Sequence, residues 1–111
     1  MNIIEPTYTW NGTLIKRKLT TYLILHHAAG YGSAESIHAY HKSLGWLGIA
    51  YHYYVRLDGT IYRGRPENVS GGHTTDYNYC SIGICAEGNF QVDTMPEAQR
   101  AALAWLVADI S

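Results

Sequence analysis

Histidine and tyrosine are the residues in this sequence best suited to chemistry. The 111 residues include six histidines and ten tyrosines, and these side chains transfer protons or bind metal ions near neutral pH. His26 and His27 end an apolar run, as at a strand-to-helix junction on the carboxyl edge of a sheet. Since adjacent strand residues point to opposite faces, only one of them faces a given cleft. A structural role and a metal-binding role are both open for this pair.

The segment Tyr51-His52-Tyr53-Tyr54 has the composition of a strand. A period of two predicts Tyr51 and Tyr53 on one face of that strand, and His52 and Tyr54 on the other. Spacing alone favours aromatic packing, with each hydroxyl hydrogen-bonded at the rim. The alternative is a tyrosine hydroxyl directed at a reacting carbonyl group.

His73 and the two cysteines have simple structural interpretations. His73 lies in a glycine-rich loop, where a solvated ring is the simpler interpretation and contact with a ligand is the alternative. Cys85 lies in an apolar run, which favours a buried, inert thiol. A cysteine hydrolase that pairs His73 with Cys80 or Cys85 is a weaker hypothesis. The odd offset between the cysteines argues against a disulfide, as expected for a chain made in a reducing compartment.

The elements that must position these residues follow from local patterns. Asp58-Gly59 between two β-prone runs predicts a type I′ hairpin, because both turn residues then need positive φ. Ile37, Tyr40 and Leu44 form an apolar stripe at helical spacing. The expected segments are a strand buried on both faces at 22–26, a helix at 33–44, hairpin strands at 49–57 and 60–63, a buried strand at 81–87, and a helix from 96 onward. This order predicts an α/β domain over 21–111, a mixed central sheet flanked by helices, preceded by an irregular arm at 1–20.

Charge and hydropathy exclude several classes of partner. Eight basic and nine acidic residues give a net charge of −1, which argues against binding to nucleic acid or to anionic lipid. No apolar stretch approaches the roughly 20 residues that span a bilayer. The N-terminus lacks the basic flank and apolar core of a signal peptide. We therefore expect a chain made in the cytoplasm, without a nucleic-acid partner or membrane insertion.

Several motifs that are weak one by one match a single family in order and spacing. They are His26-His27-Ala28-Ala29-Gly30, His41-Lys42-Ser43-Leu44-Gly45-Trp46, Gly48-Ile49-Ala50-Tyr51-His52-Tyr53, Asp58-Gly59-Thr60-Ile61-Tyr62-Arg63-Gly64-Arg65, Gly72-His73, Tyr77-Asn78, and Ser81-Ile82-Gly83-Ile84-Cys85-Ala86-Glu87-Gly88-Asn89-Phe90. From about residue 21 onward, the chain closely resembles the zinc-dependent N-acetylmuramoyl-L-alanine amidases of phage endolysins and bacterial autolysins. Peptidoglycan recognition proteins share this domain.

The resemblance implies an activity and a set of site residues. The activity is hydrolysis of the amide between N-acetylmuramic acid and L-alanine of bacterial peptidoglycan, on the cell wall after release or export. His26 matches the first of three ligands to a Zn²⁺ ion that activates water. Tyr51 matches the active-site tyrosine, which would stabilise the developing oxyanion. His73 and Asn78 match loop positions that contact the substrate.

The chain departs from the family pattern in two places. Many bacterial amidases carry a catalytic glutamate at the position of Cys85, and Glu87, two residues along, is a candidate substitute. In the family, the other two zinc ligands follow the last helix, whereas this chain ends at Ser111 within that helix. The resemblance thus implies that the final strand and the ligand loop are missing.

This departure leads to three expectations. We expect a poorly active fragment that holds little zinc, because one imidazole does not retain the metal against water. The alternative function is a peptidoglycan-binding module of the same fold without catalysis. An exposed sheet edge would also favour a homo-oligomer.

Overall fold

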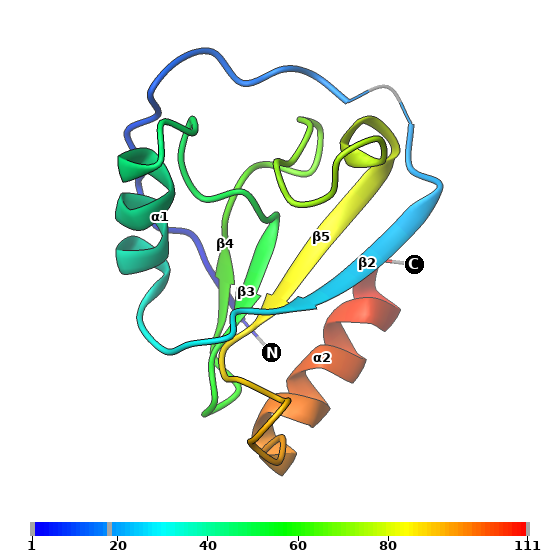
Figure 1. The fold of residues 1–111 in the computed structure, drawn as a ribbon. Coiled ribbons are helices and arrows are strands. Elements are labelled where there is room, and N and C mark those ends of the chain that lie inside the picture. Colours follow the sequence, from blue (N-terminus) through cyan, green and yellow to red (C-terminus); the bar gives the residue numbers. More distant parts are fainter. Residues whose placement is uncertain (1, 18, 111) are drawn as a thin grey trace.

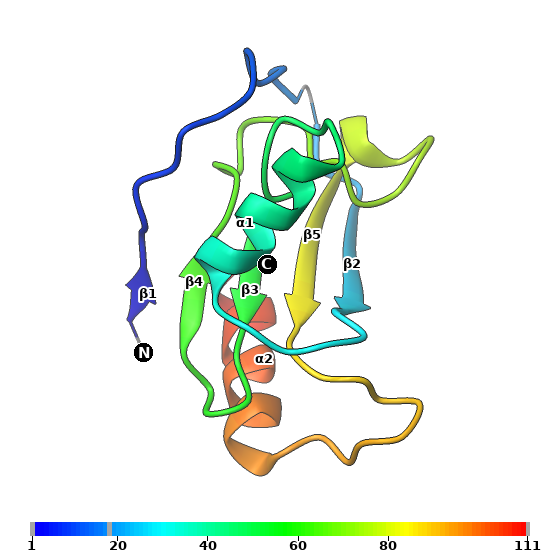
Figure 2. The ribbon, with the colours of Figure 1, turned by 60° about the vertical axis from the view of Figure 1, so that its left-hand side comes forward.

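The computed structural model describes residues 2–17 and 19–110 and shows a mixed sheet between two helices (Figure 1). Figure 2 shows α1 on one face of the sheet and α2 on the other. This confirms the predicted α/β class, while Met1 and Ser111, the outer limits of the expected arm and domain, lie outside the described residues. The elements in chain order are β1 (Ile3–Ile4), β2 (Tyr22–His27), α1 (Ala34–Ser43), β3 (Tyr53–Val55), β4 (Ile61–Arg63), a 3₁₀ turn η1 (Asn78–Cys80), β5 (Ser81–Ala86) and α2 (Glu97–Ile110).

The five strands lie in the order β1-β4-β3-β5-β2. β3 and β4 are antiparallel, while β1 pairs with β4, and β5 with both β3 and β2, in parallel. The expectation that β2 is buried on both faces is wrong, since Tyr22 is 48% and Leu25 58% exposed. Among the described residues β2 has a strand neighbour on one side only. β1 was not expected, because two residues are too short a signal within the arm.

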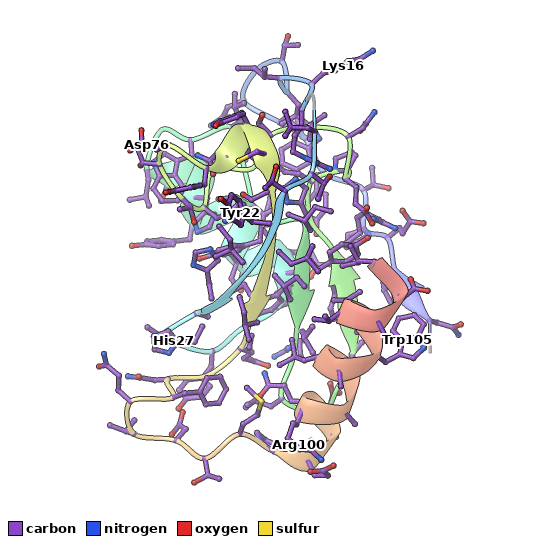
Figure 3. The ribbon with its side chains drawn as sticks, turned by 90° about the vertical axis from the view of Figure 1, so that its right-hand side faces the viewer. Lys16, Tyr22, His27, Asp76, Arg100 and Trp105 are labelled. Atoms are coloured by element: carbon purple, nitrogen blue, oxygen red, sulfur yellow. The ribbon has the colours of Figure 1, made fainter. Side chains whose placement is uncertain are left out.

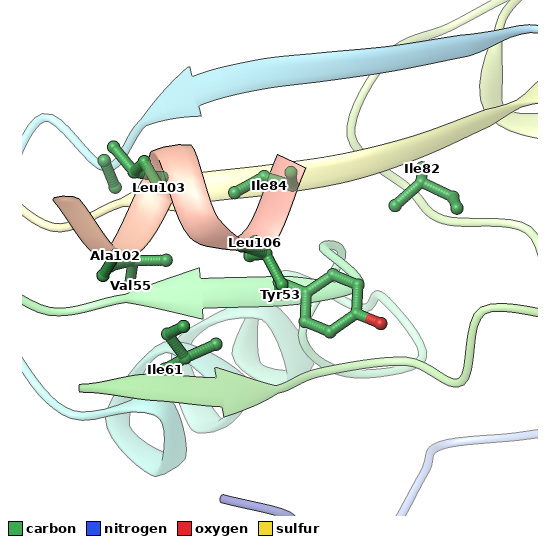
Figure 4. Close-up of a cluster of buried hydrophobic side chains, with 9 residues drawn as sticks. Tyr53, Val55, Ile61, Ile82, Ile84, Ala102, Leu103 and Leu106 are labelled. Atoms are coloured by element: carbon green, nitrogen blue, oxygen red, sulfur yellow. The ribbon is translucent and has the colours of Figure 1, made fainter. Parts of the chain in front are cut away.

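The main core lies between the sheet and α2 (Figure 4). Leu103 and Leu106 of α2 pack on inward-facing side chains of β3 and β5, among them Val55 and Ile84. β5 is buried along its whole length, as predicted. Among the described residues, no helix has the length and hydropathy to cross a membrane.

α1 begins and ends as predicted, but a different face of it is buried. The Ser33 hydroxyl caps the helix by accepting the N–H of Ser36 at 3.1 Å. Tyr40 and Leu44 of the predicted apolar stripe are exposed, whereas His38 and His41 are buried. These imidazoles take the inner face because their ring nitrogens bond to backbone groups, which removes the cost of burying them.

The β3–β4 hairpin forms as predicted, but its turn is not type I′. Of the two turn residues only Gly59 has positive φ, at 88°. The Gly59 N–H donates to the Arg56 carbonyl at 2.9 Å, and Asp58 Oδ1 accepts the N–H of Thr60 at 2.9 Å. The Asp58 side chain therefore stabilises a turn in which its own backbone stays outside the left-handed region.

The predicted face alternation of the aromatic segment is also wrong. Tyr53 belongs to the core under α2, whereas Tyr51 and Tyr54 lie on the face covered by α1. Regular strand geometry begins at Tyr53, so Tyr51 lies outside the period-two repeat. Because the backbone before Tyr53 is not a regular strand, the Tyr51 side chain points towards the end of β2.

Candidate functional site

His26 lies on the face of the sheet that α1 covers. β2 and β5 run parallel in a register that pairs His26 with Cys85. The His26 ring centroid is 5.5 Å from that of Tyr51. His27 points away and accepts the N–H of Phe90 at 3.1 Å (Figure 3), so the two adjacent histidines separate as predicted. Burial lowers the pKa of His26, which leaves the imidazole neutral and able to bind a metal at neutral pH.

His73 lies against His26, with its Nδ1 atom 2.9 Å from Nε2 of His26. The ring is held further by the hydroxyl groups of Thr74 at 3.1 Å and Ser81 at 3.3 Å. Gly83 makes room for it, because a Cβ atom there would lie 2.6 Å from ring atoms of His73. A solvated loop histidine was the simpler expectation, and it is wrong. Burial, with His26 nearby, lowers the pKa of His73 to about 3.

Asn78 fixes the loop that carries His73. Its Oδ1 atom accepts the backbone N–H groups of His73 at 3.0 Å and of Thr74 at 2.9 Å. Asn78 is half-buried at the start of η1. The side chain thus sets the position of the His73 backbone.

Tyr51 is half-buried between two histidines. Its ring centroid is 5.5 Å from that of His26 and 5.7 Å from that of His41. The Tyr51 hydroxyl interacts electrostatically with the Cys85 thiol. Burial raises the pKa of Tyr51 above its ordinary value, so the phenol keeps its proton and remains a hydrogen-bond donor.

Cys85 is a buried, unreactive thiol. It is fully buried, and burial raises its pKa to about 12. Since the thiolate is the nucleophile in cysteine hydrolases, this environment opposes a cysteine mechanism. Cys80 and Cys85 are both free, as predicted.

A cleft of about 240 Å³ opens beside Tyr51, between α1 and the loop that joins β2 to α1. Sequence reasoning missed it because Tyr40 was assigned to the packed face of the helix. The sequence signal that could have indicated the cleft was Tyr40, which lies next to His38 and His41. The lining residues are Ala28, Gly30, Tyr31, Ser36, Ile37, Tyr40, His41 and Tyr51.

Two buried histidines near the site serve the backbone. His41 Nδ1 accepts the N–H of Ala50 at 3.0 Å. His52 Nδ1 accepts the N–H of Gly83 at 3.0 Å, and its Nε2 donates to the carbonyl of Val69 at 2.8 Å. Burial lowers the pKa of each to about 4, and these rings hold the segments around Tyr51 and His73 in place.

Glu87 is fully engaged elsewhere, contrary to the expectation that it substitutes for a catalytic glutamate. Its carboxylate accepts two hydrogen bonds from Arg56, at 3.0 and 3.1 Å, and the N–H groups of Gly32 and Leu57. Burial opposes the charged form, but these bonds outweigh it and lower the pKa of Glu87. Both carboxylate oxygens of Glu87 thus accept hydrogen bonds that join three loops.

His26 is the candidate zinc ligand among the described residues. A catalytic zinc takes three protein ligands and leaves one position open. The neutral His26 imidazole suits such a ligand, and His73 is the other imidazole within contact distance of His26. Among residues 2–17 and 19–110, no group of three His, Cys, Asp or Glu side chains is placed to hold a metal. The donor set around His26 is therefore incomplete among these residues.

Sequence comparison places this geometry among known proteins. Residues 16–111 match the Amidase_2 family, described as N-acetylmuramoyl-L-alanine amidase. Peptidoglycan-recognition protein SC2 of Drosophila melanogaster is 40% identical over 99 residues, which cover 80% of this chain and 54% of that protein. The endolysin of Klebsiella phage KP32 is 34% identical over 104 residues, covering 86% of this chain and 69% of that protein. The chain thus spans little more than half the length of some curated relatives.

The chain also resembles solved structures of an amidase and of a peptidoglycan recognition protein. The endolysin amidase LysCS from Clostridium intestinale URNW superimposes with a TM-score of 0.93 at 39% identity, over 96% of this chain and 71% of that one. Peptidoglycan recognition protein LE, solved in complex with tracheal cytotoxin, matches with a TM-score of 0.88 at 27% identity, over 96% of this chain and 72% of that one. Both matched proteins extend beyond the part that aligns with this chain.

Proposed function

This chain belongs to the N-acetylmuramoyl-L-alanine amidase family, and we propose that its site serves hydrolysis of the amide between N-acetylmuramic acid and L-alanine in peptidoglycan. The observation that carries the proposal is the convergence of His26, His73 and Tyr51 on one face of the sheet. These are the residue types that such a hydrolysis needs, within contact distance of each other and beside a cleft.

His26 is the described residue proposed to bind zinc. When bound, the metal of this family supplies an activated water and polarises the carbonyl of the scissile amide. The remaining ligands are proposed to lie outside the described residues, because the matched relatives extend beyond the aligned part. The neutral state of the His26 ring supports this role, since a protonated imidazole does not bind metal.

Tyr51 is proposed to stabilise the negative charge that develops on the amide oxygen. Its phenol stays protonated at neutral pH and so has a proton to donate. In the free protein the hydroxyl has the Cys85 thiol as a polar neighbour, and sulfur is a weak acceptor. A hydrogen bond from this hydroxyl to a developing oxyanion would be strong, because it would be charge-assisted.

His73 and Asn78 are proposed to line the substrate groove as a unit. Asn78 holds the His73 backbone, and Gly83 accommodates the ring, so His73 is fixed before substrate binds. A fixed side chain loses little conformational entropy on binding. The substrate is proposed to reach this site in the cell wall, after the protein leaves the cytoplasm in which it is made.

A second function, binding of peptidoglycan without hydrolysis, is favoured by one observation. The three-ligand set is incomplete among the described residues, and a groove with His73 and Tyr51 still offers polar and aromatic contacts. The relative solved with tracheal cytotoxin shows that the fold accommodates such a ligand in that protein.

Product analysis of purified peptidoglycan separates the two functions. For the complete amidase, hydrolysis predicts new alanine amino termini in the presence of added zinc, no new reducing sugar ends, and loss of release in His26→Ala. Retention on peptidoglycan without release of either end would support the binding module. New reducing ends would contradict both, because they require cleavage of a glycosidic bond.

A further inference from the structure

Tyr31 forms an outer wall of the cleft beside Tyr51. It lies in the loop between β2 and α1, it lines the cleft, and it is 63% exposed. A tyrosine this exposed is expected to change rotamer freely. Here the hydroxyl donates a hydrogen bond to Oδ2 of Asp93, in the loop between β5 and α2. The ring is therefore anchored from a second loop, 62 residues further along the chain.

Asp93 is itself held in position. Its Oδ2 atom also accepts the backbone N–H of Asn89 at 3.0 Å, and its own N–H donates to the Asn89 carbonyl at 2.7 Å. The hydrogen bond from Tyr31 and the one from Asn89 lower the pKa of Asp93. The carboxylate is thus charged at neutral pH, and hydrogen bonds to charged groups are stronger than neutral ones.

The two loops are joined independently of this pair. Gly88 donates its N–H to the Gly30 carbonyl at 2.8 Å, and Gly32 donates its N–H to the Glu87 carboxylate at 2.8 Å. The loop that carries Asp93 is therefore fixed to the loop that carries Tyr31 by one backbone–backbone and one backbone–side-chain hydrogen bond. Losing the side-chain hydrogen bond should free the Tyr31 ring without separating the loops.

The lining of the cleft indicates which part of a ligand fits there. Its side chains are apolar, hydroxylic or aromatic, apart from His41, and burial lowers the pKa of His41 to about 4. At neutral pH the wall is therefore uncharged. Because Tyr51 belongs to the same lining, the cleft lies next to the proposed reaction centre.

We propose that Tyr31 contacts the uncharged segment of a muramyl peptide beside the scissile amide, and that Asp93 is a positioning residue that holds Tyr31 in place for this contact. The inference rests on the proposed function for the identity of the substrate. Fixing the ring in the free protein removes part of the entropy cost of ordering it on binding. Both residues therefore act on substrate affinity.

Binding of N-acetylmuramyl-L-alanyl-D-isoglutamine, measured by calorimetry with the chain of residues 1–111, tests this directly. Tyr31→Ala should weaken binding about tenfold, and Tyr31→Phe or Asp93→Asn about threefold each, as expected for one rotamer released. The double variant Tyr31→Phe/Asp93→Asn should bind like either single variant, because both remove the same hydrogen bond. A purely structural effect of Asp93 would instead be additive.

Matched controls separate failure of the inference from failure of the proposed function. Tyr22→Phe removes an exposed tyrosine hydroxyl elsewhere on the sheet, and Asp109→Asn removes an exposed carboxylate on α2; both should keep wild-type affinity. Wild-type affinity in Tyr31→Ala would overturn the inference while leaving the proposed function intact. Absence of binding by the wild-type chain would refute the proposed substrate, and the inference with it.

Discussion

The Nε2 atom of His26 and the Nδ1 atom of His73 lie 2.9 Å apart, although 47 residues separate them in the chain. One ring nitrogen of the pair must donate and the other accept, so the contact couples the tautomers of the two rings. Binding of a metal to His26 Nε2 would require this hydrogen bond to break. The Nδ1 atom of His73 is then available to a substrate group, while Gly83 still confines the ring.

Removal of the Tyr51 hydroxyl should affect chemistry more than binding. In the complete amidase, Tyr51→Phe is expected to lower kcat by roughly 10²–10³-fold, the usual cost of losing one donor to an oxyanion. KM should change little, because the ring that packs between His26 and His41 is retained. Release of alanine amino termini from peptidoglycan measures this. A variant with wild-type kcat would remove Tyr51 from the mechanism.

The glycine beneath His73 should be intolerant of a side chain. Gly83→Ala places a methyl group within 2.6 Å of the His73 ring and should lower the free energy of unfolding by about 1–3 kcal/mol, as overpacked sites do. Gly30→Ala is the matched control, because no atom lies within 4 Å of its added Cβ. Urea denaturation compares the two. Equal stability of both variants would show that the ring is not confined as described.

Acid should destabilise the fold through the buried histidines. His41 and His52 have pKa values of about 4 in the folded chain and about 6.5 when unfolded. Since the unfolded chain binds protons first, stability is full above pH 6.5 and falls as the pH drops from about 6.5 towards 4. His41→Gln keeps an acceptor for the Ala50 N–H without titrating. It should flatten the dependence measured by urea denaturation, and an unchanged slope would contradict this role.

The edge of β2 that has no strand neighbour among residues 2–17 and 19–110 should promote self-association. Leu25 is 58% exposed on this strand, and an unpaired edge with apolar side chains favours pairing with another chain. Leu25→Lys introduces the charge that natural edge strands use against such pairing. Sedimentation equilibrium should show a concentration-dependent dimer for the wild type and less of it for the variant. A wild-type monomer at all concentrations would refute the expectation.

Much of the architecture follows from local sequence patterns. The helix cap at Ser33, the apolar run of β5 and the repeat of Leu103 and Leu106 are short-range signals, and the structure bears each of them out. The direction in which Tyr51 points was not predictable, because it depends on an irregular approach to β3. Strand periodicity assigned this residue to the wrong face.

The site was harder to derive than the fold because it depends on contacts between distant segments. The glycine-rich sequence around His73 predicts a solvated ring. The pairing of β5 with β2, which local sequence does not reveal, brings Gly83 and His26 close to that ring. The inward face of α1 was missed for a related reason. Histidines are buried there because backbone N–H groups of a later loop bond to His38 and His41.

Zinc titration of histidine-labelled protein tests the central claim, that His26 is the metal-binding residue beside Tyr51 and His73. Dialysed chain of residues 1–111 should hold well under one equivalent of zinc, because the described ligand set is incomplete. Added zinc should then shift the ¹⁵N resonance of His26 Nε2 before those of His38, His41 and His52, and His26→Ala should abolish the response of His73. Binding of zinc by His26→Ala with wild-type affinity would contradict the account.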